Sequence, residues 1–178
     1  MKQSLPLFDA EGEGDAVLSD CGRYRYQLRR RVKGPSGRHG TVLFVCLNPS
    51  TADARLDDPT TRKLLGFTER WGFSDYTLCN LFAFRATDPA VLSIPDDPVG
   101  PDNDRVIAES FHGVDRIVFA WGSHPPVRSL IVARALAVSQ AMMAVRTAPL
   151  PLCLGRCKDG APRHPLMLAY TTPLEPYR

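Results

Sequence analysis

The sequence predicts an α/β fold, a three-layer sandwich in which a short parallel four-stranded sheet carries helices on both faces and follows an N-terminal β extension. Four apolar runs of strand length stand at 41–46, 76–83, 116–121 and 150–154, with helical patterns between them. Strands that are buried on both faces of a parallel sheet are nearly continuous apolar runs, as these four are. At 178 residues the chain is long enough for one domain with a sizeable core.

The first forty residues contain the β extension. Residues 1–20 are acidic and contain glycine, and we expect a loosely held lead-in ahead of a single domain at 21–178. The stretch "RYRYQLRRRV" then alternates with a period of two, which predicts a strand. Its basic outer face is formed by Arg23, Arg25, Arg29 and Arg31. The turn "KGPSGRHG" leads into the 41–46 run, so we expect these two strands to pair as a hairpin.

Three helices are predicted between and after the apolar runs. Asp58 is suited to cap the first helix, because Pro59 follows it at the first helical position. Apolar side chains recur at helical spacing over 59–71, and a glycine ends the pattern. The patterns of 103–113 and 127–144 predict the other two helices.

The composition is that of an ordinary globular protein, with 44% hydrophobic and 23% charged residues. No apolar run approaches the length of a membrane span and no signal-peptide pattern is present, so we expect a cytoplasmic protein without a membrane partner. Five scattered cysteines, with no second Cys or His pair at zinc spacing, predict reduced thiols and no metal site. No cofactor is expected, and the net charge of +3 is compatible with an anionic partner.

Polar residues gather where the predicted strands end. In open α/β sheets, ligands bind beyond the carboxyl ends of the strands. That rule selects the loops at 47–50, 85–89, 121–124 and 155–166. Each loop brings polar groups to the same edge of the sheet, which a core alone does not need.

Ordinary structural roles account for several of these residues. Asn48 precedes a proline and favours a turn, Asp58 favours a helix cap, and His124 beside two prolines is typical of a solvated loop. Asn80 fits such an explanation least, because it stands in the middle of the apolar run "LCNLFAF". Burying its amide costs roughly 1–3 kcal/mol without a hydrogen bond, so either the backbone satisfies it or it faces a pocket.

The motifs of the chain resemble two families. The strings "LNPSTAD", "DDPT", "NLFAFRATDP", "DPVGPDND", "AWG" and "RHPL" are similar to those of the bacterial family known as domain of unknown function 1643, along nearly the whole chain. That resemblance implies no activity. A weaker resemblance is to the uracil-DNA glycosylase superfamily, because "CLNPS", Asn80 and "RHPL" stand in the order of its water-binding loop, base-reading Asn and catalytic His loop. It implies a short parallel sheet flanked by helices.

The second resemblance implies a role for each matching residue. Asn48 would position the attacking water, Asn80 would read the base edge, and His164 would stabilise the departing base through a hydrogen bond. Further contacts to substrate are expected from Pro49, Ser50, Arg85 and Asp58. Leu47 stands where the superfamily has glycine, Leu166 where it usually has serine, and no aspartate takes the water-activating place.

Three functions stay open from the sequence. The prediction is a hydrolase that cleaves an N-glycosidic bond in DNA or in a nucleotide. The alternatives are a non-catalytic nucleic-acid or nucleotide-binding module, and an enzyme acting on a small nucleoside or sugar. The arginine face of residues 23–31 bears on the choice, because long nucleic acid requires salt-dependent phosphate contacts beside the site. If that face lies away from the polar loops, a small substrate is favoured; a solvated, charge-guarded sheet edge also explains it.

Overall fold

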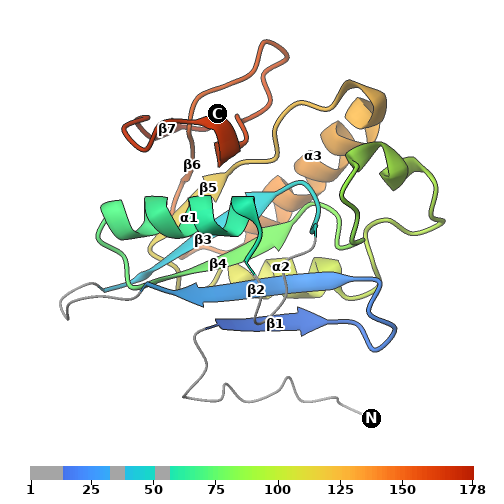
Figure 1. The fold of residues 1–178 in the computed structure, drawn as a ribbon, viewed down its shortest axis with the longest axis horizontal. Helices are drawn as coiled ribbons and strands as arrows, with labels where there is room; N and C mark the ends of the chain where they lie inside the picture. The colour runs from blue at the N-terminus through green and yellow to red at the C-terminus, as the bar shows by residue number, and fades with distance from the viewer. Residues whose placement is uncertain (1–13, 33–38, 51–56) are drawn as a thin grey trace.

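The computed structural model describes residues 14–32, 39–50 and 57–178. In these residues one mixed seven-stranded sheet forms the middle layer, in the order β1-β2-β4-β3-β5-β6-β7 (Figure 1). The strands are β1 (Gly14–Leu18), β2 (Arg25–Arg31), β3 (Thr41–Cys46), β4 (Asp75–Asn80), β5 (Arg116–Phe119), β6 (Pro151–Cys153) and β7 (Glu175–Pro176). The helices are α1 (Pro59–Arg70), α2 (Asn103–Ser110) and α3 (Arg128–Ala144), with 3-10 turns η1 (Pro89–Ser93), η2 (Pro125–Val127) and η3 (Pro165–Met167).

The four predicted apolar strands form the parallel centre of this sheet. β3 pairs in parallel with both β4 and β5, and β5 pairs in parallel with β6. The prediction of a four-stranded sheet is nevertheless wrong in extent, because antiparallel strands extend it on both sides. Edge strands keep one face or one edge in solvent, so they do not need the continuous apolar runs by which the centre was predicted. One of them, β1, lies in the segment expected to be a loose lead-in.

The predicted hairpin between the 23–32 strand and the 41–46 strand is wrong. β4 lies between β2 and β3 and pairs antiparallel with β2. β3 is apolar and buried along nearly its whole length, so burial on both sides, between β4 and β5, suits it better than a place beside the more polar β2. Strand order is thus set by burial and not by closeness in sequence.

The expected exposed face of four arginines is wrong for Arg25. The β1–β2 pairing passes from Gln27 to Arg25 and leaves Tyr26 without an opposite residue, which is a β-bulge. One extra residue shifts the alternation of side chains between the two faces. Arg25 is consequently buried, with 1% of its surface exposed, whereas Arg23 and Arg31 are exposed.

Two apolar cores, one on each face of the sheet, hold the three layers together. α1 packs Leu64 and Phe67 against Phe44 of β3 on one face. α2 and α3 pack against the other face, where Ile107 and Val138 belong to the second core. The three predicted helices are confirmed, and each begins within one residue of its predicted start.

α3 differs from α1 because its outward side is also apolar. Val132, Leu136 and Met143 on this side are 58%, 60% and 70% exposed. By length and composition alone, the helical stretch Pro125–Ala144 would be able to cross a membrane, contrary to the sequence expectation; a single helix of this kind is weak evidence. The expected absence of a membrane partner therefore stays a prediction.

Candidate functional site

The loops that follow the parallel strands meet at the carboxyl edge of the sheet. Hydrogen bonds join them in pairs, from Ala86 N–H to the Pro49 carbonyl (2.9 Å) and from Gly122 N–H to the Pro162 carbonyl (2.9 Å). The polar side chains gathered at this edge are called the rim site, and they are Asn48, Asp58, Asn80, His124 and His164. Four of these five were predicted from the sequence as catalytic or substrate-binding residues.

Asn48 joins two loops of the rim site. Its Nδ2 donates to the carbonyl oxygens of Ala86 (2.7 Å) and Pro49 (3.1 Å). The turn-forming role that the sequence suggested is therefore present. Because Nδ2 is held twice, the orientation of the amide is set, and Oδ1 is the atom through which Asn48 can accept a hydrogen bond from a ligand.

Asn80 is the polar group with the least favourable surroundings. It is 1% exposed, and neither side-chain polar atom has a hydrogen-bond partner within the described part of the chain. Asn103, equally buried, instead donates from Nδ2 to the carbonyls of Asn80 (3.1 Å) and Leu81 (3.2 Å). Leaving an amide buried without partners costs roughly 1–3 kcal/mol. Of the two explanations offered by the sequence, satisfaction by the backbone is thus not the one observed.

His164 is a neutral imidazole with one defined donor. Burial lowers its pKa to about 4, the nearby His124 lowers it further, and the Asp58 carboxylate opposes both. The backbone N–H of Leu166 donates to Nδ1 at 3.3 Å, so the proton of the neutral ring is on Nε2. At neutral pH this side chain therefore presents an Nε2–H donor.

His124 was expected to be a solvated loop residue and is instead partly buried beside His164. Burial lowers its pKa, while a hydrogen bond to the Trp121 backbone and the charge of Asp88 raise it. Gly122 has φ +75°, and a Cβ there would lie 3.2 Å from His164 Cβ and 3.4 Å from His124 Nε2. Only glycine both adopts this backbone easily and lets the two histidines approach.

Asp58 has the capping role that the sequence indicated. Its Oδ1 accepts the N–H of Thr61 at 2.8 Å, at the first turn of α1. The same carboxylate is near Arg25, whose pKa is lowered by burial to about 10, raised by Asp58 and lowered by the charge of Arg85. Arg25 is a cation at neutral pH, so this end of the rim site holds two arginines and one carboxylate.

The arginines of β2 divide between the two ends of the sheet. At the rim end, Arg85 N–H donates to the Arg23 carbonyl (3.0 Å), and Arg25 N–H to the Ala83 carbonyl (2.9 Å). Arg29 and Arg31 stand opposite the start of β4, where the parallel strands begin. Arg29 forms an ion pair there with Asp75 at 3.2 Å. The predicted arginine face therefore does not follow the rim site along its length.

Other groups limit the chemistry of this edge. Pro49 is buried and Ser50 is partly exposed, whereas the rest of the "LNPSTAD" loop lies outside the described residues. The five cysteines are free, and burial raises the pKa of Cys46 to about 12 and that of Cys79 to about 11, so both are protonated thiols. Among the residues described, no three His, Cys, Asp or Glu side chains are grouped so as to hold a metal ion.

Comparison with protein families identifies the group to which this sequence belongs. The family model described as "Protein of unknown function (DUF1643)" matches residues 25–166. The chain belongs to the DUF1643 family. The DUF1643 match runs from β2 to η3 and includes the whole rim site. No curated protein and no solved structure matches the chain, and the resemblance to the uracil-DNA glycosylase superfamily is not supported by these comparisons.

Proposed function

We propose that the rim site binds a nucleobase and hydrolyses the N-glycosidic bond between the base and its sugar. The observation that carries this proposal is Asn80, whose amide is buried at the ligand-binding edge with both polar atoms lacking partners in the described chain. An amide offers an acceptor and a donor side by side, which complements a base edge with an adjacent donor and acceptor. A pocket of this kind uses a few polar groups to orient an otherwise apolar ligand.

His164 supports the bond-breaking step. When the C1′–N bond breaks, its electron pair goes to the base, and negative charge develops on a base oxygen. The Nε2–H of neutral His164 can donate a hydrogen bond to that oxygen without transferring its proton. The water oxygen then bonds to C1′, and its proton passes to solvent or to the departed base.

Asn48 supports the placement of that water. Its Nδ2 bonds to Ala86 and Pro49 orient the amide, so that Oδ1 can accept a hydrogen bond from the attacking water. An amide is a weak base, and its contribution is orientation and not deprotonation. The reaction therefore depends on a good leaving group, which an oxygen-bearing base stabilised by His164 is.

The arginines favour a small substrate over a long nucleic acid. Arg25 and Arg85 are at the rim site and can neutralise one phosphate, whereas Arg29 and Arg31 are at the far end of β2. A duplex held along the β2 face would need these far contacts as well. The proposed substrate class is accordingly a nucleotide, with a base in DNA as the alternative.

A non-catalytic nucleotide-binding module is the second candidate. Asp58, the carboxylate of the rim site, is engaged as the cap of α1, and Asn48 is a weak base. These two facts favour binding without turnover. They leave the roles of Asn80 and His164 as hydrogen-bonding groups unchanged.

The test is a panel of substrates incubated with the purified chain, with release of free base measured chromatographically and binding measured by calorimetry. The panel contains nucleosides, nucleoside monophosphates and oligonucleotides that carry uracil or hypoxanthine. Release from a nucleotide supports the proposal, and release from oligonucleotides alone replaces the nucleotide by DNA. Binding without release establishes the module, and neither binding nor release rejects both candidates.

A further inference from the structure

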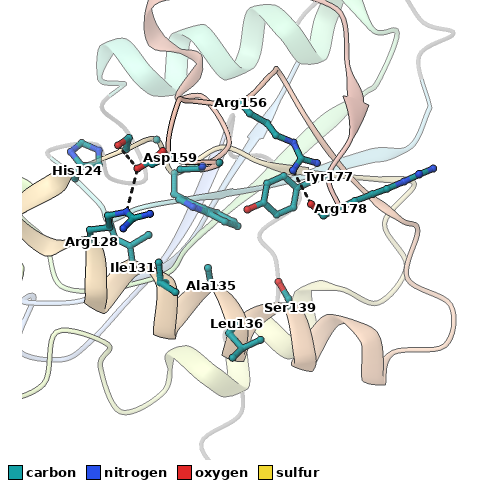
Figure 2. Close-up of a pocket in the computed structure, with 16 residues that line it drawn as sticks. His124, Arg128, Ile131, Ala135, Leu136, Ser139, Arg156, Asp159, Tyr177 and Arg178 are labelled. Carbon is teal, nitrogen blue, oxygen red and sulfur yellow. Dashed lines mark hydrogen bonds and ion pairs between the residues drawn. The ribbon is translucent and has the colours of Figure 1, made fainter.

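A second hollow, here called the α3 pocket, lies on the α3 face of the sheet (Figure 2). Its volume is about 350 Å³, within the range of small-molecule sites. The walls come from α3, the loop after β5, the 156–161 loop and the last two residues, Tyr177 and Arg178. It adjoins the rim site through Gly122 and His124 but opens on the opposite face of the sheet.

One wall of the α3 pocket is apolar and open to solvent. Ile131, Val132 and Leu136 of α3 form it, and Trp121 and Tyr177 stand on the other side. Val132 and Leu136 are 58% and 60% exposed although both border a concave surface. Exposed apolar side chains that line a hollow indicate a ligand with an apolar body.

One end of the pocket carries a cation that is weakly held. Arg128, with 60% of its side chain exposed, lies 3.8 Å from Asp159 Oδ2, a distance at which an exposed ion pair contributes little. Asp159 is held without Arg128, because it accepts from Ser123 Oγ (2.6 Å) and from Ala161 N–H (3.2 Å). Arg128 can therefore turn to another anion without leaving Asp159 unpartnered.

The remaining charges of the α3 pocket are also cationic. Arg156 donates to the Arg178 carbonyl at 2.8 Å and packs over the Tyr177 ring at 4.9 Å, so its position is set by neighbours. Three arginines and one aspartate line the pocket, namely Arg128, Arg156, Arg178 and Asp159. The net positive charge favours an anionic ligand.

We propose that the α3 pocket binds a small amphipathic anion, a carboxylate with an unbranched apolar body. The carboxylate contacts Arg128, and the apolar body lies along α3 toward Leu136. These two residues are eight positions apart on the helix, which corresponds to about 12 Å at a rise of roughly 1.5 Å per residue. A medium-chain carboxylate such as octanoate spans about this length. The site is independent of the proposed hydrolysis, since no rim-site hydrogen bond is used.

The test uses Trp121 as a reporter. The chain has two tryptophans, so Trp71→Phe leaves Trp121, in the pocket wall, as the source of fluorescence. Octanoate should change this fluorescence saturably and bind about tenfold more tightly than octanol or octylamine, which have the same tail with a neutral or cationic head. Each methylene removed from the tail should weaken binding about fourfold, the equivalent of roughly 0.8 kcal/mol per buried methylene.

Two matched pairs of variants locate the site. Arg128→Gln should remove the tenfold preference for octanoate over octanol, whereas Arg146→Gln, an exposed arginine outside the pocket, should keep it. Leu136→Ser should weaken both ligands, whereas Met143→Ser, at the comparably exposed position beyond the pocket, should not. If Trp71→Phe does not fold, equilibrium dialysis of labelled octanoate against the unaltered chain and the same four variants gives the same comparison. Absence of saturable binding, or equal effects within either pair, overturns the proposal.

Discussion

The rim site and the α3 pocket lie at the same edge of one sheet but depart from ordinary packing in opposite ways. The rim site buries a polar group, Asn80, without partners in the described chain. The α3 pocket leaves apolar groups, Val132 and Leu136, open to water. Buried polar groups and exposed apolar surfaces are the two informative exceptions to the burial rule. Here they indicate two ligands, one recognised by hydrogen bonds and one by apolar area.

The two sites should therefore respond differently to substitution. A buried polar group left unpaired by a wrong ligand costs far more than a misplaced methylene, so the rim site should discriminate strongly. The α3 pocket gains its affinity from area and from one exposed cation, so single changes there should be modest. Large effects at the α3 pocket, or small ones at the rim site, would break this comparison.

The largest expected effect is on catalysis at His164. His164→Ala should slow base release from the nucleotide substrate by about 10²–10³-fold, the usual loss for one donor to a developing negative charge. Steady-state rates at saturating substrate measure this. His112→Ala, which removes an exposed histidine from the loop after α2, is the control and should change nothing. Equal rates for the two variants would contradict the role of the Nε2–H donor.

A second effect concerns stability as a function of pH. The pKa of His164 is lowered to about 4 from an ordinary value of 6.5, so between these pH values the unfolded chain binds a proton that the folded chain does not. This stabilisation is complete above pH 6.5 and is lost as the pH falls toward 4. His164→Gln should therefore reduce the loss of unfolding free energy over this window by about 1–3 kcal/mol, with His124 contributing to the remaining slope.

Urea unfolding at several pH values between 4 and 7.5 measures this dependence. His112→Gln serves as the control, because that side chain is exposed. A slope that is the same in His164→Gln and in the control would show that the His164 ring is solvated.

The smallest expected effect is at the far end of β2. Arg29→Ser with Arg31→Ser should leave nucleotide affinity and its salt dependence unchanged, because both residues stand opposite the start of β4 and away from the rim site. Arg85→Ser should weaken binding and flatten the salt dependence, because a phosphate contact releases counterions. Calorimetric titration at several salt concentrations compares them. A flatter slope in the Arg29 and Arg31 variant would instead favour a long nucleic acid.

The parallel centre and the helices were predictable because burial on both faces leaves a direct pattern. The strand expected at 41–46 is β3 (Thr41–Cys46), and the helix expected at 59–71 is α1 (Pro59–Arg70). The edge strands were not, since β7 has two residues and β1 lies in an acidic segment. Strand order and the burial of Arg25 depend on partners far away in sequence and on a bulge, which no local period records.

The rim site was partly predictable for a similar reason. The strand-end rule selected Asn48 and His164, and an amide inside an apolar run identified Asn80. His124 was missed, although the glycine two positions before it marked a close approach at the end of β5. The α3 pocket was missed because its walls come from distant segments, from Trp121 to Tyr177. An outward helix face without charge was the available signal.

The stability and ligand binding of Asn80→Leu, measured together, test the central claim most directly. If the buried amide is kept for a ligand, the leucine should raise the free energy of unfolding by about 1–3 kcal/mol and abolish binding of the nucleotide that the unaltered chain binds. Asn103→Leu is the matched control and should lower stability, because Nδ2 loses its bonds to the carbonyls of Asn80 and Leu81. An Asn80→Leu chain that is less stable, or that binds the nucleotide unchanged, would contradict a base-reading role for Asn80.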